Sequence, residues 1–281
     1  SIVTSLKERQ QTGPVANQKN CAPQRVNGRK SLTCGLGLTP TWMGKAYVLT
    51  DEASLSTRKL VKDILGSHVV LLVNTTGNVH GQTHVEKILK EYVGPEVSRM
   101  KEVLALDPKE RWFFGEDHAP GHYFDQCSKE GKVTGLNAKR RAWFEANKCH
   151  RRMTPKCGTP QYMVGDQLHH IFKHRVHKRL EWLIGHQKDL TKLKAVQDLC
   201  HRGGIFVTLS GYQRGPTLFL FCLAVAIEKS LFSQYMVMAA FCKCGFFSKD
   251  DCHKLFGVNK ELMQLGCVEL DHAQQELTAL H

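Results

Sequence analysis

Short apolar runs alternate with amphipathic stretches through the first half of the chain. Residues 46–49 and 112–114 have the apolar and aromatic composition of strands, and residues 68–73 (HVVLLV) form the near-continuous run of a strand buried on both faces. Residues 56–65 have the apolar spacing of a helix that ends at Gly66. Strands that alternate with helices predict an α/β fold with a mostly parallel central sheet and helices on both of its faces.

The same patterns predict further helices. Thr83 and Glu86 have the spacing of a capping box at the start of a helix. Gly94-Pro95 predicts a break before the next helix. Residues 166–184 predict a long helix with one apolar face and a second face rich in His and Lys. We expect the C-terminal part of the chain to be helical.

One stretch combines a predicted strand, a polar turn and a buried helix. A glycine pair leads into the apolar residues 205–207, which we expect to form a strand, and residues 210–215 form the polar turn. Pro216 then precedes an apolar run over residues 218–227, and proline is well tolerated in the first turn of a helix. A loop at this place points backbone N–H groups toward the positive end of the helix dipole, so its natural ligand is an anion.

Changes in composition divide the chain into four parts. Residues 1–40 are rich in polar and basic residues, Gly and Pro, and they predict a basic extended arm. Residues 41–125 form the first part of the α/β domain, residues 126–165 a basic insertion rich in Cys and His, and residues 166–281 the second part with C-terminal helices. The sequence has no internal repeat of fixed period.

The chain carries a large positive charge. Its 39 Lys and Arg exceed its 26 Asp and Glu, which gives a formal net charge of +13. Nine of these net charges come from residues 139–179, which hold eleven Lys and Arg against two acids. A polyanion is the commonest partner for such a charge, and aromatic residues in the same segment would stack on bases. Solubility alone is the alternative explanation.

We therefore expect the basic insertion and the following helix to bind nucleic acid. RNA is favoured, and another phosphorylated partner is the alternative. Each selected side chain would neutralise a backbone phosphate. The selected residues are Arg140, Arg141, Arg151, Arg152, Lys173, Arg175 and Lys178.

Eleven cysteines and fifteen histidines are many for 281 residues. An odd cysteine count, with cysteines such as Cys222 inside apolar runs, favours free thiols and a reducing compartment, the cytoplasm or the nucleus. Cys149, His150 and Cys157 are a loosely spaced candidate for a structural zinc site. Charged residues interrupt the apolar stretch 218–242, so we expect no membrane span.

Together these pieces resemble the cysteine-dependent protein phosphatases of the tyrosine and dual-specificity kind. The resemblance covers residues 45–230, with residues 125–175 as an insertion. It implies a phosphate-binding loop that ends at Arg214, whose guanidinium would hold the phosphate, and a general acid at Asp117. It also implies a thiolate six positions before the arginine, where this chain has Thr208.

Because the nucleophile is missing, the resemblance implies phosphate binding without thiol chemistry. The implied phosphate-binding residues are Thr208, Ser210, Gly211, Arg214 and Thr217. The leading hypothesis is a phosphate-recognising, RNA-binding intracellular protein that is not catalytic. The alternatives are a phosphoesterase in which Asp117 and Arg214 are catalytic, and a scaffold that binds an acidic protein.

Overall fold

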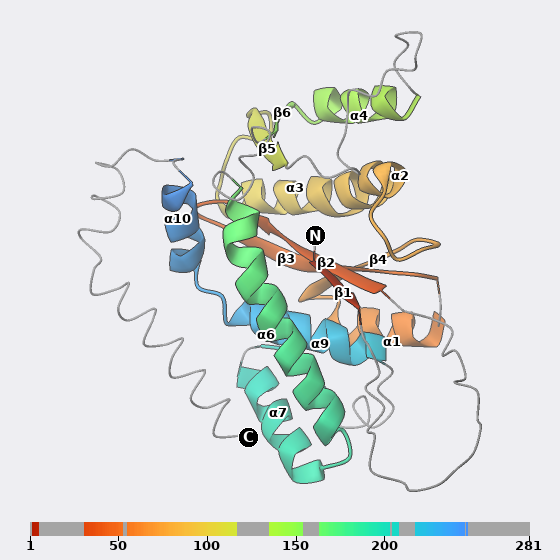
Figure 1. The fold of residues 1–281 in the computed structure, drawn as a ribbon. Helices are drawn as coiled ribbons and strands as arrows, with labels where there is room; N and C mark the ends of the chain where they lie inside the picture. The colour runs from red at the N-terminus through yellow and green to blue at the C-terminus, as the bar shows by residue number, and fades with distance from the viewer. Residues whose placement is uncertain are drawn as a thin grey trace, which may run out of the picture.

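The computed structural model of the chain describes residues 2–5, 31–52, 55–116, 135–153, 163–202, 204–207, 217–244 and 246. These residues form a mixed α/β fold in which helices cover a small β-sheet (Figure 1). The sequence prediction of an α/β fold is confirmed at this level.

A four-stranded sheet has the order β1-β2-β3-β4. The strands are β1 (Ile2–Ser5), β2 (Ser31–Leu38), β3 (Met43–Thr50) and β4 (Val69–Val73). β1 and β2 are antiparallel, β2 and β3 are antiparallel, and β3 and β4 are parallel. A short turn between β2 and β3 suits only an antiparallel pair, whereas the helix α1 (Leu55–Leu65) lets β4 return parallel to β3. The predicted mostly parallel sheet is therefore not confirmed.

The first 40 residues do not form an arm throughout, because residues 31–38 are strand β2 of the sheet. Leu32 and Cys34 are buried in the core. Gly35 lies against Tyr47, and a Cβ at Gly35 would approach the Tyr47 ring to 2.5 Å. A glycine in a strand often marks such a close approach, and it also weakens the strand pattern that the sequence presents.

Helices cover both faces of the sheet. Side chains alternate between the two faces along each strand, so each face packs in a hydrophobic cluster of its own. Ala46 and Val48 face the larger hydrophobic cluster, while Tyr47 and Leu49 face the smaller one. The larger cluster includes α1, α6 (Val164–His186), α7 (Leu190–Arg202), α9 (Thr217–Ser230) and α10 (Gln234–Lys243). The smaller cluster includes η1 (His84–Val93) and α4 (Gly135–Ala146). The predicted two-sided cover is thus present.

The start of the helix after β4 differs from the prediction. The short helix α2 (Gly81–Thr83) leads directly into η1, and His80 caps it by accepting a hydrogen bond from the Thr83 N–H at its ring nitrogen, at 3.4 Å. The Thr83 side chain makes no capping bond. The predicted capping box of Thr83 and Glu86 is therefore replaced by a histidine cap one turn earlier.

The predicted break at Gly94-Pro95 is also replaced by a helix, because η1 continues directly into α3 (Gly94–Val103). Gly94 N–H bonds to the Leu89 carbonyl, five residues back, so η1 has the wide π-helical spacing. Pro95 then lies in the first turn of α3, where a proline is tolerated without its N–H.

A second, two-stranded sheet lies beside the smaller cluster. Its strands β5 (Trp112–Glu116) and β6 (Cys149–Met153) are parallel, and α4 connects them along the chain. A helix between two parallel strands is a βαβ unit. Residues 112–114 are in a strand as predicted, and the basic insertion contributes α4 and β6 to regular structure.

Candidate nucleic-acid interface

One face of the β5–β6 sheet is open to solvent and carries an aromatic ring among cations. Phe113, Gly115, His150 and Arg152 are exposed, whereas the residues that alternate with them are buried or partly buried. Phe113 is 63% exposed. Arg111, which is also exposed, lies just before β5. We refer to these five residues as the outer face.

The side chains of the outer face contact one another. Phe113 and His150 are register partners, and their ring centroids are 5.6 Å apart with the planes tilted by 32°. Arg152 Cζ lies 5.1 Å from the centroid of the Phe113 ring. Arg111 Nη1 lies 3.5 Å from His150 Nε2. A ring beside guanidinium groups offers a base-stacking surface and phosphate donors at one place.

The inner face of the same sheet packs on α4, and this packing holds the outer face in position. Trp112 and Trp143 are edge to face with ring centroids 6.3 Å apart, and Phe114 lies 6.1 Å from Phe144. The Trp112 indole N–H donates to the Asn147 carbonyl at 2.9 Å. Such aromatic contacts each stabilise a fold by about 0.5–1.5 kcal/mol beyond the area that they bury.

A buried polar cluster joins both strands to the helix after β4. The Glu116 carboxylate lies 2.5 Å from His84 Nε2 and 2.5 Å from Arg151 Nε, and the Glu116 and His84 side chains are at most 3% exposed. Arg140 is 1% exposed and donates to the Gly81 carbonyl at 3.1 Å. Burial lowers the pKa of the Arg140 guanidinium, and the nearby Glu116 carboxylate opposes this change. Buried charges need such compensation, so the cluster fixes β5, β6 and α4 relative to η1.

Two arginines that the sequence assigns to phosphate contacts therefore belong to this structural cluster instead. Arg140 is buried, and the Arg151 side chain, 12% exposed, is bound to Glu116. Successive residues point about 100° apart on a helix and to opposite faces on a strand, which turns Arg140 of α4 and Arg151 of β6 inward while their basic neighbours face solvent. Arg141 and Arg152 are exposed, and their contact with nucleic acid stays a prediction.

The basic residues of α6 lie in a different part of the fold. Lys173 and Lys178 are exposed, and Arg175 is partly buried with its Cζ 5.8 Å from the centroid of the Phe232 ring. α6 packs mainly against α9, α10, β1 and β2, whereas β6 packs against β5 and α4. The structure thus does not gather the predicted residues of α6 and β6 into one cluster.

The predicted zinc ligands Cys149 and His150 point to opposite faces of β6. Cys149 is buried in the smaller hydrophobic cluster, and burial raises the pKa of its thiol to about 12. His150 is exposed on the outer face. Neighbouring strand residues cannot both reach one ion, since their side chains alternate, and Cys157 lies outside the described residues. Within the described ranges, no group of three or more His, Cys, Asp or Glu could hold a metal ion.

Most of the predicted phosphate-binding loop also lies outside the described residues. This applies to Thr208, Ser210, Gly211 and Arg214, and to the predicted acid Asp117. Thr217 is the exposed first residue of α9, the buried helix that the sequence predicts after the loop.

The segment that leads to this loop is not the predicted strand. Among the described residues, 205–207 pair with no strand; instead Ile205 N–H bonds to the Cys200 carbonyl at 2.7 Å, and the Gln197 side chain donates to the Val207 carbonyl at 2.8 Å. Helix α7 therefore provides the hydrogen bonds that a sheet would have supplied.

No family model, curated protein or solved structure matches the chain in the comparisons made. The resemblance to cysteine-dependent phosphatases therefore stays a prediction. Among the helices of the described residues, none is long and apolar enough to cross a membrane.

The sequence analysis did not select Phe113, Arg111, His84 or Glu116. The strand pattern at 112–114 does not show which side chains face solvent, since three aromatic residues follow one another. The alternation becomes visible only when β5 is aligned with β6, where Trp112 pairs with Cys149 and Phe113 with His150. His84 and Glu116 are 32 residues apart in sequence, and their contact depends on the tertiary fold.

Proposed function

We propose that the chain binds single-stranded RNA through the outer face of β5–β6. A single exposed phenylalanine would need no functional explanation. The surroundings of Phe113 support the proposal. The His150 ring centroid lies 5.6 Å from the Phe113 ring centroid, and Arg152 Cζ lies 5.1 Å from it. Aromatic side chains on an open sheet face, with basic groups beside them, are a common way of binding unstacked RNA bases.

Single-stranded RNA suits this surface better than a duplex. In a duplex the faces of the bases are stacked on each other, so an aromatic side chain has no free base to contact. Phe113 can cover one free base, while Arg111 and Arg152 supply charges to the adjoining phosphates. The formal net charge of +13 favours association with any such polyanion.

The proposal is tested by comparing two phenylalanine variants for binding to a fluorescent, unstructured RNA oligonucleotide. Phe113→Ala should weaken binding by about 5- to 150-fold, because stacking on one base contributes about 1–3 kcal/mol. The matched control is Phe206→Ala, since Phe206 is 71% exposed and lies 5.4 Å from the His201 ring, next to the predicted loop. If Phe206→Ala lowered the affinity for the RNA and Phe113→Ala did not, the RNA would bind away from the outer face.

Two further measurements separate stacking from general charge attraction. Unlabelled single-stranded RNA should displace the probe, whereas polyglutamate of equal total charge should displace it much less. Equal displacement by polyglutamate would instead support an acidic protein as the partner. Single-stranded DNA of the same sequence reports whether the 2′-hydroxyl contributes.

A further inference from the structure

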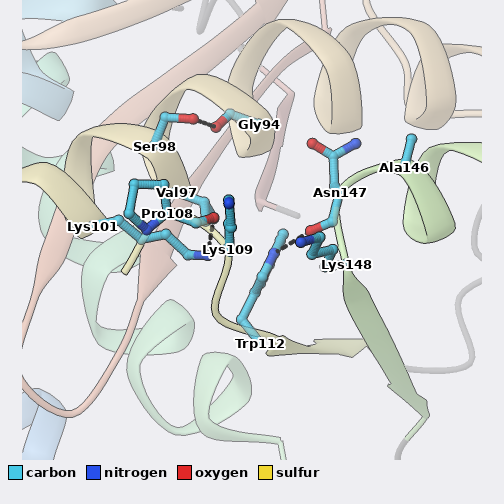
Figure 2. Close-up of a pocket in the computed structure, with 10 residues that line it drawn as sticks. All are labelled: Gly94, Val97, Ser98, Lys101, Pro108, Lys109, Trp112, Ala146, Asn147 and Lys148. Carbon is cyan, nitrogen blue, oxygen red and sulfur yellow. Dashed lines mark hydrogen bonds between the residues drawn. The ribbon is translucent and has the colours of Figure 1, made fainter. Parts of the chain in front are cut away.

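A second feature lies at the amino ends of β5 and β6. A hollow of about 230 Å³ is bounded by α3, by the segment that leads into β5, and by the turn between α4 and β6 (Figure 2). Among the described residues, its walls include Ser98, Lys101, Lys109, Trp112, Asn147 and Lys148 and no Asp or Glu. The volume is smaller than the roughly 300–1,000 Å³ of pockets that enclose whole small molecules. It suits a single charged group better than an entire nucleotide.

Three lysines from three segments converge on this hollow. Lys101 of α3 is 8% exposed, and its ammonium donates to the carbonyls of Pro108 and Glu110 at 3.0 and 2.6 Å. An ammonium has three protons, so one remains for a further acceptor. Lys109 and Lys148 are exposed. In Figure 2 the Trp112 indole runs between these two side chains.

Hydrogen bonds from the surrounding polar side chains hold the walls of the hollow in place. The Asn147 side-chain amide donates to the Trp143 carbonyl at 2.7 Å, and the Ser98 hydroxyl to the Gly94 carbonyl at 3.1 Å. Two acids lie near Lys109 in sequence: the Asp107 carboxylate accepts from the Lys109 backbone N–H at 2.8 Å, and the next residue, Glu110, is exposed. The hollow is thus a positively charged site with a rigid base.

The hollow and the outer face are adjacent along both strands. Trp112 lines the hollow, and Phe113 is the next residue on the outer face; Lys148 lines the hollow, and His150 follows two residues later. An RNA strand whose base stacks on Phe113 would therefore bring a neighbouring phosphate to the lysines. A terminal phosphate monoester carries about −1.5 to −2 charges at neutral pH, against one for an internal diester.

We propose that this lysine-lined hollow binds the terminal phosphate of the RNA strand that the outer face holds. The inference rests on the proposed function. The chemistry recognised is a phosphate monoester, which either end of an RNA strand can carry. The direction of the strand across β5 and β6 decides which end enters the hollow.

The test uses one RNA sequence in three forms, with a 5′-phosphate, with a 3′-phosphate and with hydroxyls at both ends. A terminal phosphate at one or both ends should increase the affinity about tenfold, as expected for hydrogen bonds to charged groups. Lys109→Gln and Lys148→Gln should each reduce this gain, because each removes one ammonium. Lys59→Gln is the matched control, since Lys59 is an exposed lysine of α1, which packs in the other cluster.

The outcomes distinguish the two proposals. If the hydroxyl form does not bind, the proposed function fails. If it binds and neither terminal phosphate adds affinity, the inference fails while the proposed function stands. If the gain persists in both Lys109→Gln and Lys148→Gln, the phosphate is bound elsewhere and the inference is overturned. A second readout does not depend on RNA: the parent and both variants are titrated with inorganic phosphate while the NMR signal of the Trp112 indole N–H is monitored.

Discussion

At the scale of single residues, two tyrosines of the smaller cluster tie the sheet to the helix after β4. The Tyr92 hydroxyl donates to the Lys45 carbonyl and accepts from the Gly37 N–H, both at 2.6 Å. Burial raises the pKa of Tyr92, so the hydroxyl keeps the proton that it donates. Tyr47 lies 4.8 Å from Tyr92, edge to face. Glycines of β2 give these rings their space.

Gly35→Ala should destabilise the protein by about 1–3 kcal/mol, because overpacking forces side chains and backbone to shift. The new Cβ would lie 2.5 Å from the Tyr47 ring. Gly115→Ala is the matched control, since no atom lies within 4 Å of the Cβ that it adds. Urea unfolding followed by circular dichroism measures both. Equal stability of the two variants would show that Tyr47 moves aside at no cost.

At the scale of elements, the buried ion pair between α6 and α9 has a role distinct from the basic surface of α6. Arg179 Nε lies 3.0 Å from Glu228 Oε1, and the two side chains are 11% and 4% exposed. Glu228 is part of a run of ten buried residues in α9. A charge in such a helix is stable only with its partner, so the pair fixes how α6 lies on α9.

Arg179→Met should destabilise the protein by about 3–5 kcal/mol, because it leaves the Glu228 carboxylate buried without its partner. The double variant Arg179→Met, Glu228→Leu should recover most of this loss, since an apolar pair of similar volume can replace a buried ion pair. Guanidinium unfolding measures the free energy of unfolding of the parent protein and of both variants. If the double variant is as unstable as the single one, loss of packing rather than the unpaired charge explains the effect.

How far the sequence predicts each element depends on how locally its signal is encoded. Strands β3 and β4 and helix α9 are predicted correctly, because each contains a run of consecutive apolar residues that indicates burial. Strand β2 is missed because its glycines, which leave room for the Tyr47 and Tyr92 rings, interrupt the apolar strand pattern. Residues 205–207 have strand composition, yet the Val207 carbonyl is bonded by side chains of α7 rather than by a neighbouring strand. Such outcomes depend on tertiary partners, which periodicity does not contain.

The candidate site follows the same rule. The sequence identifies Arg152 as a candidate through the basic segment, but it equally selects Arg140, which the fold buries. Charge counts cannot separate the two, because both lie in the same basic run of residues 139–179. Phe113 is missed for the converse reason, since its exposed face exists only once β5 pairs with β6.

At the scale of the whole molecule, the positive charge divides into structural and accessible parts. Arg140, Arg151 and Arg179 have internal partners, whereas Arg111, Arg152, Lys109 and Lys148 reach solvent around β5 and β6. A net charge alone attracts RNA from any direction, and only a localised site gives particular residues a larger share of the salt dependence. The two cases are distinguishable by experiment.

The logarithm of the RNA affinity should fall linearly with the logarithm of salt concentration, with a slope of about −0.7 for each neutralised phosphate of a single strand. The double variant Arg111→Gln, Arg152→Gln should therefore reduce the slope by about 1.4, because two phosphate contacts are lost. The matched control is Lys59→Gln, Lys62→Gln, which removes two exposed charges from α1 on the other side of the sheet. Titrations between low and physiological salt measure the slopes. If both double variants reduce the slope equally, the attraction is spread over the whole surface, and the outer face has no special part in binding.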